Sequence, residues 1–257
     1  MKSIQYLLIL LLFSFSCSNK EDSPENQRTY NDVRLDFSSL VFNEGVNDVT
    51  LLNVNNFLWS FRVNMPAVDF INNKRPLIID LHGFSGDNTD AHKTTSCYIQ
   101  TVFSSLEAII ISPNAGNYLW EDLLNQEQVL SLVDLAVTYL PVDASKIVVI
   151  GYSAGGNGSW FLGESQPNVF SAAIPISSSY NTTTGGVSRL MEIPFYVIHG
   201  EDYDYFPLQL TQDWVNATIS AGSDITFVIA SGLNHFEPCS YAPYIEEAAQ
   251  WLVNDVW

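Results

Sequence analysis

Residues 146–156 decide the fold and read KIVVIGYSAGG. The continuous apolar run at 147–150 is typical of a strand that is buried on both faces. A Gly-x-Ser-x-Gly pattern follows at once, from Gly151 to Gly155. Glycines beside the serine suit a tight strand-to-helix turn, because a side chain at either place would collide with neighbouring backbone. We therefore expect a strand, a turn that exposes Ser153, and then a helix.

By composition alone, the three fixed positions of the pattern recur by chance in about one such chain in ten. The pattern is informative here because a buried strand precedes it and a helix is expected to follow it. A serine on this turn presents its hydroxyl at a helix N-terminus, where the Ala154 N–H can stabilise a developing oxyanion. Ser153 is therefore the candidate nucleophile. The alternative interpretation is a glycine-rich turn with only a structural role.

Further apolar runs of the same kind alternate with helical stretches. The runs are Leu77–Leu81, Ala108–Ile111, Ala172–Ile176, Phe195–Ile198 and Ile225–Ala230. The helical candidates are Asn125–Leu140, Gly158–Glu164, Leu208–Ser220 and Tyr241–Val256. Such alternation predicts an α/β protein with a doubly wound, mostly parallel sheet.

Two other segments complete the predicted domain. Residues 33–65 alternate polar and apolar in short runs, notably Val49–Val54 and Phe57–Val63, which predicts antiparallel strands at one sheet edge. The link from Ser179 to Pro194 is too short to hold a large lid domain. We expect a single catalytic domain over residues 32–257.

Several stretches together resemble the secreted esterase branch of the α/β-hydrolases, which includes polyhydroxybutyrate depolymerase-like and feruloyl esterase-like proteins. They are Lys74-Arg75-Pro76-Leu77, Leu81-His82-Gly83, Val142-Asp143, Gly151–Gly156, Trp160, Phe170-Ser171-Ala172-Ala173 and His199-Gly200. The resemblance runs from about Val54 to the C-terminus. It implies the α/β-hydrolase fold and a serine carboxylic ester hydrolase that needs no cofactor.

The resemblance also implies an order of catalytic residues along the chain: serine, acid, histidine. Of the four histidines, only His235 follows Ser153 with room for an acid between them. His235 is therefore the expected base. His92 lies in a polar stretch and is expected to be solvated, and His199 is expected to support a turn.

The acid is expected in the loop after the strand Phe195–Ile198. Relatives carry it four residues after the histidine that matches His199, but Tyr203 stands there in this chain. The proline that usually follows is in place as Pro207. Asp204 is the preferred acid, because a position further into the loop gives more freedom to reach His235, and Asp202 is the alternative.

The remaining site expectations concern the oxyanion hole and the substrate. In the resembling family the loop that begins at His82-Gly83 supplies the second oxyanion N–H, which here belongs to Phe84. Ala154 supplies the first, and His82 is expected to be structural. Aromatic residues are frequent near these loops, and Trp120 is a candidate platform for an aromatic acyl group or a sugar. The other interpretation is that these rings only pack loops onto the domain.

The N-terminus resembles a bacterial lipoprotein leader of the Bacteroidetes type. The run Tyr6–Phe15 has the length of a signal-peptide core, and Ser16 precedes Cys17. The resemblance implies a signal peptide at 1–16, lipidation of Cys17, a disordered tether at 17–31, and an outer-membrane lipoprotein of a kind that can be exposed on the cell surface. An ordinary secretory signal is the alternative.

Composition excludes several classes of function. The formal net charge is −18, and the chain lacks a run of Lys or Arg, so nucleic acid is not an expected partner. Scattered histidines and the absence of an H-x-x-x-H spacing argue against a metal site. The expected partner is an ester substrate, and membrane contact is expected only through Cys17. Cys97 and Cys239 form either a disulfide or two buried thiols.

Two other functions remain open at this point. One is a serine peptidase of the same fold, and the other is a non-catalytic surface binding protein. The complete serine, histidine and glycine framework argues against the second, whereas Tyr203 in the usual place of the acid favours it. The sequence therefore predicts an esterase acting on carbohydrate, phenolic or small acyl esters.

Overall fold

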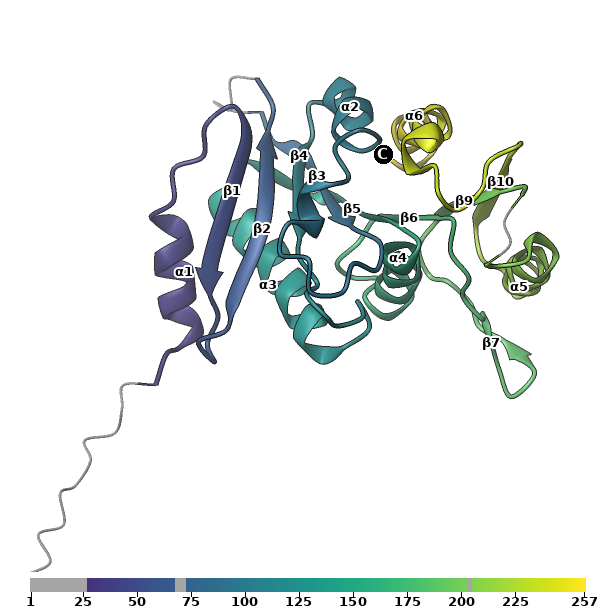
Figure 1. Cartoon of the computed structure of the whole chain (residues 1–257), viewed down its shortest axis with the longest axis horizontal. Coiled ribbons are helices and arrows are strands. Elements are labelled where there is room, and N and C mark those ends of the chain that lie inside the picture. The colour runs from purple at the N-terminus through teal and green to yellow at the C-terminus, as the bar shows by residue number, and fades with distance from the viewer. Residues whose placement is uncertain (1–26, 68–72, 203–204) are drawn as a thin grey trace, which may run out of the picture.

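The computed structural model describes residues 27–67, 73–202 and 205–257, and its main feature is an eight-stranded sheet (Figure 1). The strand order is β1-β2-β4-β3-β5-β6-β9-β10. The strands are β1 (Gly45–Leu52), β2 (Leu58–Met65), β3 (Arg75–Leu81), β4 (Ile109–Pro113), β5 (Val142–Tyr152), β6 (Ala172–Ile176), β9 (Phe195–Gly200) and β10 (Ile225–Ala230).

Strand direction follows the sequence prediction. β2 pairs antiparallel with both β1 and β4, whereas β4, β3, β5, β6, β9 and β10 run parallel to one another. The predicted doubly wound, mostly parallel sheet with antiparallel N-terminal strands is confirmed. Between β6 and β9 the chain forms only the short hairpin of β7 (Thr183–Thr184) and β8 (Val187–Ser188), which agrees with the expectation of no large lid.

Helices cover both faces of the sheet, as the continuously apolar strands require. The helices are α1 (Tyr30–Ser38), α2 (Gln100–Phe103), α3 (Leu123–Tyr139), α4 (Ala154–Ser165), α5 (Leu208–Ser220) and α6 (Ala242–Trp251). Side chains of α1, α3, α4 and α5 join one buried cluster, and side chains of α2 and α6 join the other.

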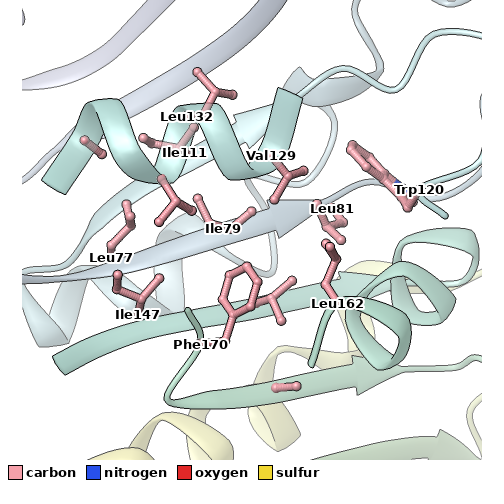
Figure 2. Close-up of a cluster of buried hydrophobic side chains, with 14 of the residues drawn as sticks. Leu77, Ile79, Leu81, Ile111, Trp120, Val129, Leu132, Ile147, Leu162 and Phe170 are labelled. Carbon is pink, nitrogen blue, oxygen red and sulfur yellow. The ribbon is translucent and has the colours of Figure 1, made fainter. Parts of the chain in front are cut away.

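Successive residues of a strand point to opposite faces, so β3 contributes to both clusters. Leu77, Ile79 and Leu81 belong to the cluster beneath α3, where Figure 2 shows them facing Val129 and other α3 side chains. Ile78 belongs to the opposite cluster. Both faces of the strand are therefore buried from Leu77 to Leu81.

Helix α1 corrects the prediction for the N-terminal part of the domain. It begins at Tyr30, two residues before the expected domain start, and it occupies residues expected to form strands. Thr29 and Asp32 form a capping box at its N-terminus, and Val33 and Phe37, one turn apart, are buried. The two apolar residues on one helical face were too few to outweigh the alternating pattern around them.

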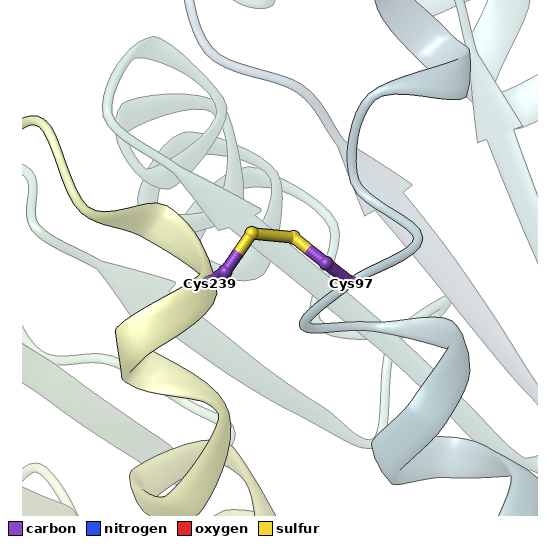
Figure 3. Close-up of a disulfide and its surroundings, with 2 residues drawn as sticks. All are labelled: Cys97 and Cys239. Atoms are coloured by element: carbon purple, nitrogen blue, oxygen red, sulfur yellow. A yellow bond between two sulfur atoms is a disulfide. The ribbon is translucent and has the colours of Figure 1, made fainter.

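A disulfide joins Cys97 to Cys239, with the two Cα atoms 5.5 Å apart (Figure 3). This settles the choice that the sequence left open between a disulfide and two buried thiols. The bond ties the segment before α2 to the segment before α6, across 142 residues of chain. A cross-link that closes so long a loop stabilises the folded state by about 4–5 kcal/mol in the chain-entropy model.

The N-terminal predictions lie outside the described residues. These are the signal peptide at 1–16, the lipidation of Cys17, and the tether as far as residue 26. Within residues 27–67, 73–202 and 205–257, no helix is both long and apolar enough to span a membrane.

Candidate active site

Ser153 occupies the turn between β5 and α4 with φ 58° and ψ −119°. A non-glycine residue in this left-handed region is strained by about 1–3 kcal/mol, and such strain concentrates at functional sites. Close backbone contacts leave no room for a side chain at either flanking glycine. A Cβ on Gly151 would overlap the carbonyl of Gly155, and a Cβ on Gly155 would overlap the carbonyl of Leu81. The turn therefore has the geometry that the sequence motif predicts.

His235, in the loop after β10, faces the serine across the sheet edge. Its Nε2 lies 3.3 Å from the Oγ of Ser153, which is within hydrogen-bond distance. Partial burial lowers the pKa of His235 below its usual 6.5. The imidazole is therefore neutral at pH 7 and able to accept a proton.

Aromatic rings surround His235, and the sequence analysis assigned most of them no particular place. The ring centroids of Tyr205 and Phe236 lie 5.1 and 5.5 Å from that of His235. Both side chains are largely exposed, at 64% and 73%. Tyr152 is closer to the interior, and its hydroxyl donates a hydrogen bond to the backbone carbonyl of His235. The histidine therefore lies between a buried support and an exposed aromatic surface.

The structure describes only one of the two candidate acids. Asp204 lies outside the described residues. Asp202 is exposed, and its backbone N–H donates to the carbonyl of Leu233 over 3.1 Å, which holds the loop after β9 beside the loop that carries His235. The side chain of Asp202 makes neither a hydrogen bond nor an ion pair with His235. The carboxylate of Glu201 accepts from Ser231 Oγ and the Gly232 N–H, at 2.6 and 3.0 Å.

The loop after β3 supplies the other side of the site. Gly83 lies against the serine, since a Cβ there would be 3.5 Å from the Cβ of Ser153. Phe84 follows with a side chain that is 71% exposed, and Ala154 is the first residue of α4. Phe84 thus follows the glycine that lies against Ser153, and Ala154 directly follows Ser153, while their roles as oxyanion N–H donors stay predictions.

His82 is buried and holds this loop in place. Its Nε2 accepts a hydrogen bond from the Ala115 N–H over 3.1 Å, so the proton is on Nδ1, which contacts the Gly83 carbonyl at 2.6 Å. Burial lowers the pKa of His82, which keeps the ring neutral. Its role is structural, as the sequence analysis expected.

Trp120 corrects a prediction, because it is only 1% exposed and presents no face to a substrate. Its Nε1 donates to the His82 carbonyl over 2.9 Å, and a Cβ on Gly158 would overlap its ring. It packs the loop after β4 against the loop after β3 and α4. The sequence placed Trp120 correctly at the functional edge but does not distinguish an inward ring from an outward one.

The remaining histidines are also structural. His92 was expected to be solvated but is buried beside Asn114, whose Nδ2 lies 3.1 Å from its Nδ1, and burial lowers its pKa to about 4. His199 is buried, with its Nε2 3.0 Å from the carbonyl of Phe206. It supports the turn after β9, as expected. In the described part of the chain, no group of three or more His, Cys, Asp or Glu residues gathers in a way that would hold a metal ion.

The chain is similar to known esterases and serine hydrolases. The family model described as phospholipase/carboxylesterase matches residues 120–242. A thermostable esterase structure has a TM-score of 0.67 and 19% identity, covering 81% of this chain, and the chain spans 62% of that protein's length. A fluorophosphonate-binding serine hydrolase F of Staphylococcus aureus has a TM-score of 0.68 and 16% identity over 83% of this chain and 100% of its own.

Esterase 2 of Thermogutta terrifontis, in its native form, has a TM-score of 0.66 and 16% identity, covering 81% of this chain and 92% of that one. A search of curated proteins finds no match. The structural likenesses, together with the strand order, confirm the predicted α/β-hydrolase fold.

Proposed function

We propose that this protein is a serine esterase that hydrolyses carboxylic esters through an acyl-enzyme at Ser153. The observation that carries the proposal is the 3.3 Å approach of Ser153 Oγ to His235 Nε2 at a strained strand-to-helix turn. The phospholipase/carboxylesterase family match over residues 120–242 supports ester chemistry over other reactions of the fold.

The proposed reaction has two halves. His235 takes the proton of Ser153 as Oγ attacks the ester carbonyl, and the N–H groups of Ala154 and Phe84 hold the resulting oxyanion. The C–O bond to the alcohol then breaks, and the alcohol leaves with the proton from His235. Water, deprotonated by His235, attacks the acyl-enzyme, and Ser153 regains its proton as the acid product leaves.

The acid of the triad is proposed to be Asp204, with Asp202 as the alternative. A carboxylate that accepts the Nδ1 proton of His235 orients the ring and stabilises the imidazolium that forms during the reaction. One observation favours Asp204. The side chain of Asp202 is exposed and makes no hydrogen bond or ion pair with His235.

The substrate is proposed to be a carbohydrate, phenolic or small acyl ester. The exposed rings of Phe84, Tyr205 and Phe236 supply apolar surface around the nucleophile, and flat or ring-shaped ester groups pack well on such surface. We also propose that the protein is exported and anchored through Cys17. The Cys97–Cys239 disulfide supports an oxidising compartment outside the cytoplasm.

A panel of esters tests this function. The panel holds p-nitrophenyl acetate and butyrate, methyl ferulate and an acetylated xylo-oligosaccharide, and each is incubated with the protein and with Ser153→Ala. We expect turnover that disappears in the variant, and the preferred ester names the substrate class. Absence of turnover by the folded protein would contradict the proposal and favour a peptide substrate or a binding role.

A further inference from the structure

The sheet edge that carries Ser153 also holds a cavity of about 200 Å³. It lies between the β1–β2 turn, the loop after β4 and the start of α3. Phe57, Trp59 and Tyr118 contribute aromatic surface to its wall, and Leu124 contributes an aliphatic side chain. Among the residues that the structure describes, those that line the cavity are all uncharged. The cavity is therefore suited to an uncharged ligand with an apolar face.

Three buried amide side chains also line the cavity: Asn53, Asn125 and Gln128. Backbone partners fix the orientation of each amide. Asn53 Oδ1 accepts from the N–H groups of Asn55 and Phe57, both at 2.9 Å, and Asn125 Nδ2 donates to the carbonyls of Ala115 and Leu119. Gln128 Nε2 points to the carbonyl of Ser60 at 3.5 Å.

The other half of each amide makes no hydrogen bond within the residues that the structure describes. These atoms are one donor, Asn53 Nδ2, and two acceptors, Asn125 Oδ1 and Gln128 Oε1. Each of the three atoms keeps some surface accessible to solvent, although the side chains are buried and their residues line the cavity. One donor and two acceptors are therefore available to water or to the polar groups of a ligand.

Hydroxyl groups both donate and accept, so a polyhydroxylated ring can pair with a donor and two acceptors at once. The C–H face of such a ring packs on aromatic side chains. A phenol has too few hydroxyls to reach amides on three separate elements. An anionic ligand is disfavoured, because the wall offers no cation and the chain carries a formal charge of −18.

The cavity and Ser153 lie on one edge, joined through the loop after β4. Ala115 lines the cavity and donates to His82, which directly precedes Gly83 beside the serine. The order β2-β4-β3-β5 separates the cavity from Ser153 by two to three strands. Strands lie about 4.8 Å apart, which gives a separation of roughly 10–14 Å. A ligand in the cavity thus reaches Ser153 only as part of a longer chain.

We propose that this cavity is a subsite for a neutral sugar residue, and that the ester is carried on an oligosaccharide whose chain extends from Ser153 to the cavity. The assignment of the substrate rests on the proposed esterase function, whereas the binding of sugar by the cavity does not. Neutral oligosaccharide esters are therefore the substrate class that the arrangement of amides and aromatic rings favours.

Titration calorimetry with xylotetraose, cellotetraose and mannotetraose tests the subsite directly. We expect at least one of them to bind the wild-type protein. Leu124→Trp, which fills the cavity, should weaken binding about tenfold or more, and Gln128→Leu, which removes one acceptor, about fivefold. Leu123→Trp is the matched control, since the neighbouring Leu123 is exposed and lies outside the cavity wall. The affinity of Leu123→Trp for the oligosaccharide should equal that of the wild type.

Hydrolysis of p-nitrophenyl acetate, which is too small to reach the cavity, separates the two proposals and reports folding. All three variants should turn it over at the wild-type rate, while on acetylated xylotetraose Leu124→Trp should raise KM and leave kcat unchanged.

Absence of oligosaccharide binding by a protein that hydrolyses p-nitrophenyl acetate would overturn the subsite alone and leave a water-filled cavity. Equal binding by Leu123→Trp and Leu124→Trp would also overturn it. Binding without any ester turnover would instead refute the esterase proposal.

Discussion

The hydroxyl of Tyr152 donates a hydrogen bond to the backbone carbonyl of His235, so the residue next to the nucleophile also holds the base. The two rings lie 5.7 Å apart, and Tyr152 packs in turn on Tyr241 at 5.6 Å. The strained turn after β5 and the loop after β10 are thereby fixed to each other. The distance between Ser153 and His235 depends on this contact as well as on the strands.

Tyr152→Phe tests the importance of that contact. The variant keeps the ring but loses a hydrogen bond whose net contribution is about 1 kcal/mol, so the His235 loop becomes less well fixed. We expect kcat on p-nitrophenyl butyrate to fall about three- to tenfold with little change in KM. Tyr98→Phe is the control, because Tyr98 is buried beside Tyr152 but does not reach His235. An unchanged kcat in Tyr152→Phe would show that the contact does not position the base.

The assignment of the acid is tested by two substitutions in one loop. Asp204→Asn should reduce kcat/KM on a p-nitrophenyl ester by about 10⁴-fold, because an amide cannot stabilise the imidazolium. Asp202→Asn should cost far less, since the Asp202 side chain is exposed and does not contact His235. Steady-state kinetics of both variants decide the matter. Equal losses would refute the choice of Asp204, and a larger loss in Asp202→Asn would reverse it.

The pH dependence of activity follows from the pKa of His235. Burial lowers this pKa below 6.5, and only the neutral ring can accept the proton of Ser153. Activity is therefore present above the pKa and is lost as pH falls through it. We expect the acidic limb of the kcat/KM profile of Asp204→Asn, which lacks the proposed carboxylate beside the ring, to have its midpoint below pH 6.5. A midpoint above pH 7 would contradict the effect of burial on this histidine.

Asp80, a fully buried carboxyl on β3, should make stability depend on pH. Burial raises its pKa from 3.8 to about 6, although the hydroxyls of Thr95 and Ser112 donate to it. A raised acid pKa stabilises the folded state at low pH, and that contribution is lost as pH rises from about 4 to 6. The loss is about 3 kcal/mol at most.

Asp80→Asn removes this dependence and keeps an acceptor for both hydroxyls. We expect the variant to exceed the wild type in free energy of unfolding at pH 8 and to lose that advantage near pH 3.5, as measured by urea denaturation. Asp48→Asn is the opposite control. Hydrogen bonds from Arg62 lower the pKa of Asp48, so its loss should destabilise the protein at neutral pH. A difference for Asp80→Asn that does not change with pH would contradict the assignment.

The sequence predicted the sheet well because strands buried on both faces are unbroken apolar runs. β6 and β10 have the predicted bounds, and β3, β4 and β9 differ by one or two residues at an end. β5 is longer than predicted, by five residues at its start and two at its end. The exception is α1, whose buried side is only Val33 and Phe37. A helix that buries so few side chains leaves almost no periodic signal, and the nearby strand pattern outweighed it.

The site was predictable where backbone geometry dictates residue type, and less so where packing decides. Glycines on either side of Ser153 follow from close backbone contacts, which any sequence with this turn must satisfy. The inward rings of Trp120 and His92 depend on loops packed from distant segments. Local polarity predicted the wrong environment for His92, and a place at the functional edge does not show that the ring of Trp120 points inward. The pairing of Cys97 with Cys239 depends on a distance in space, which sequence separation does not reveal.

The central claim, that His235 activates Ser153 as a nucleophile, is tested most directly by covalent labelling with a fluorophosphonate. The reagent is incubated at pH 7.5 with the wild-type protein, Ser153→Ala and His235→Ala, and the labelled peptide is identified by mass spectrometry. The account predicts rapid labelling of Ser153 in the wild type, no labelling in Ser153→Ala, and labelling slowed by orders of magnitude in His235→Ala. Labelling of Ser153 at the same rate without His235, or no labelling of the folded wild type, would contradict it.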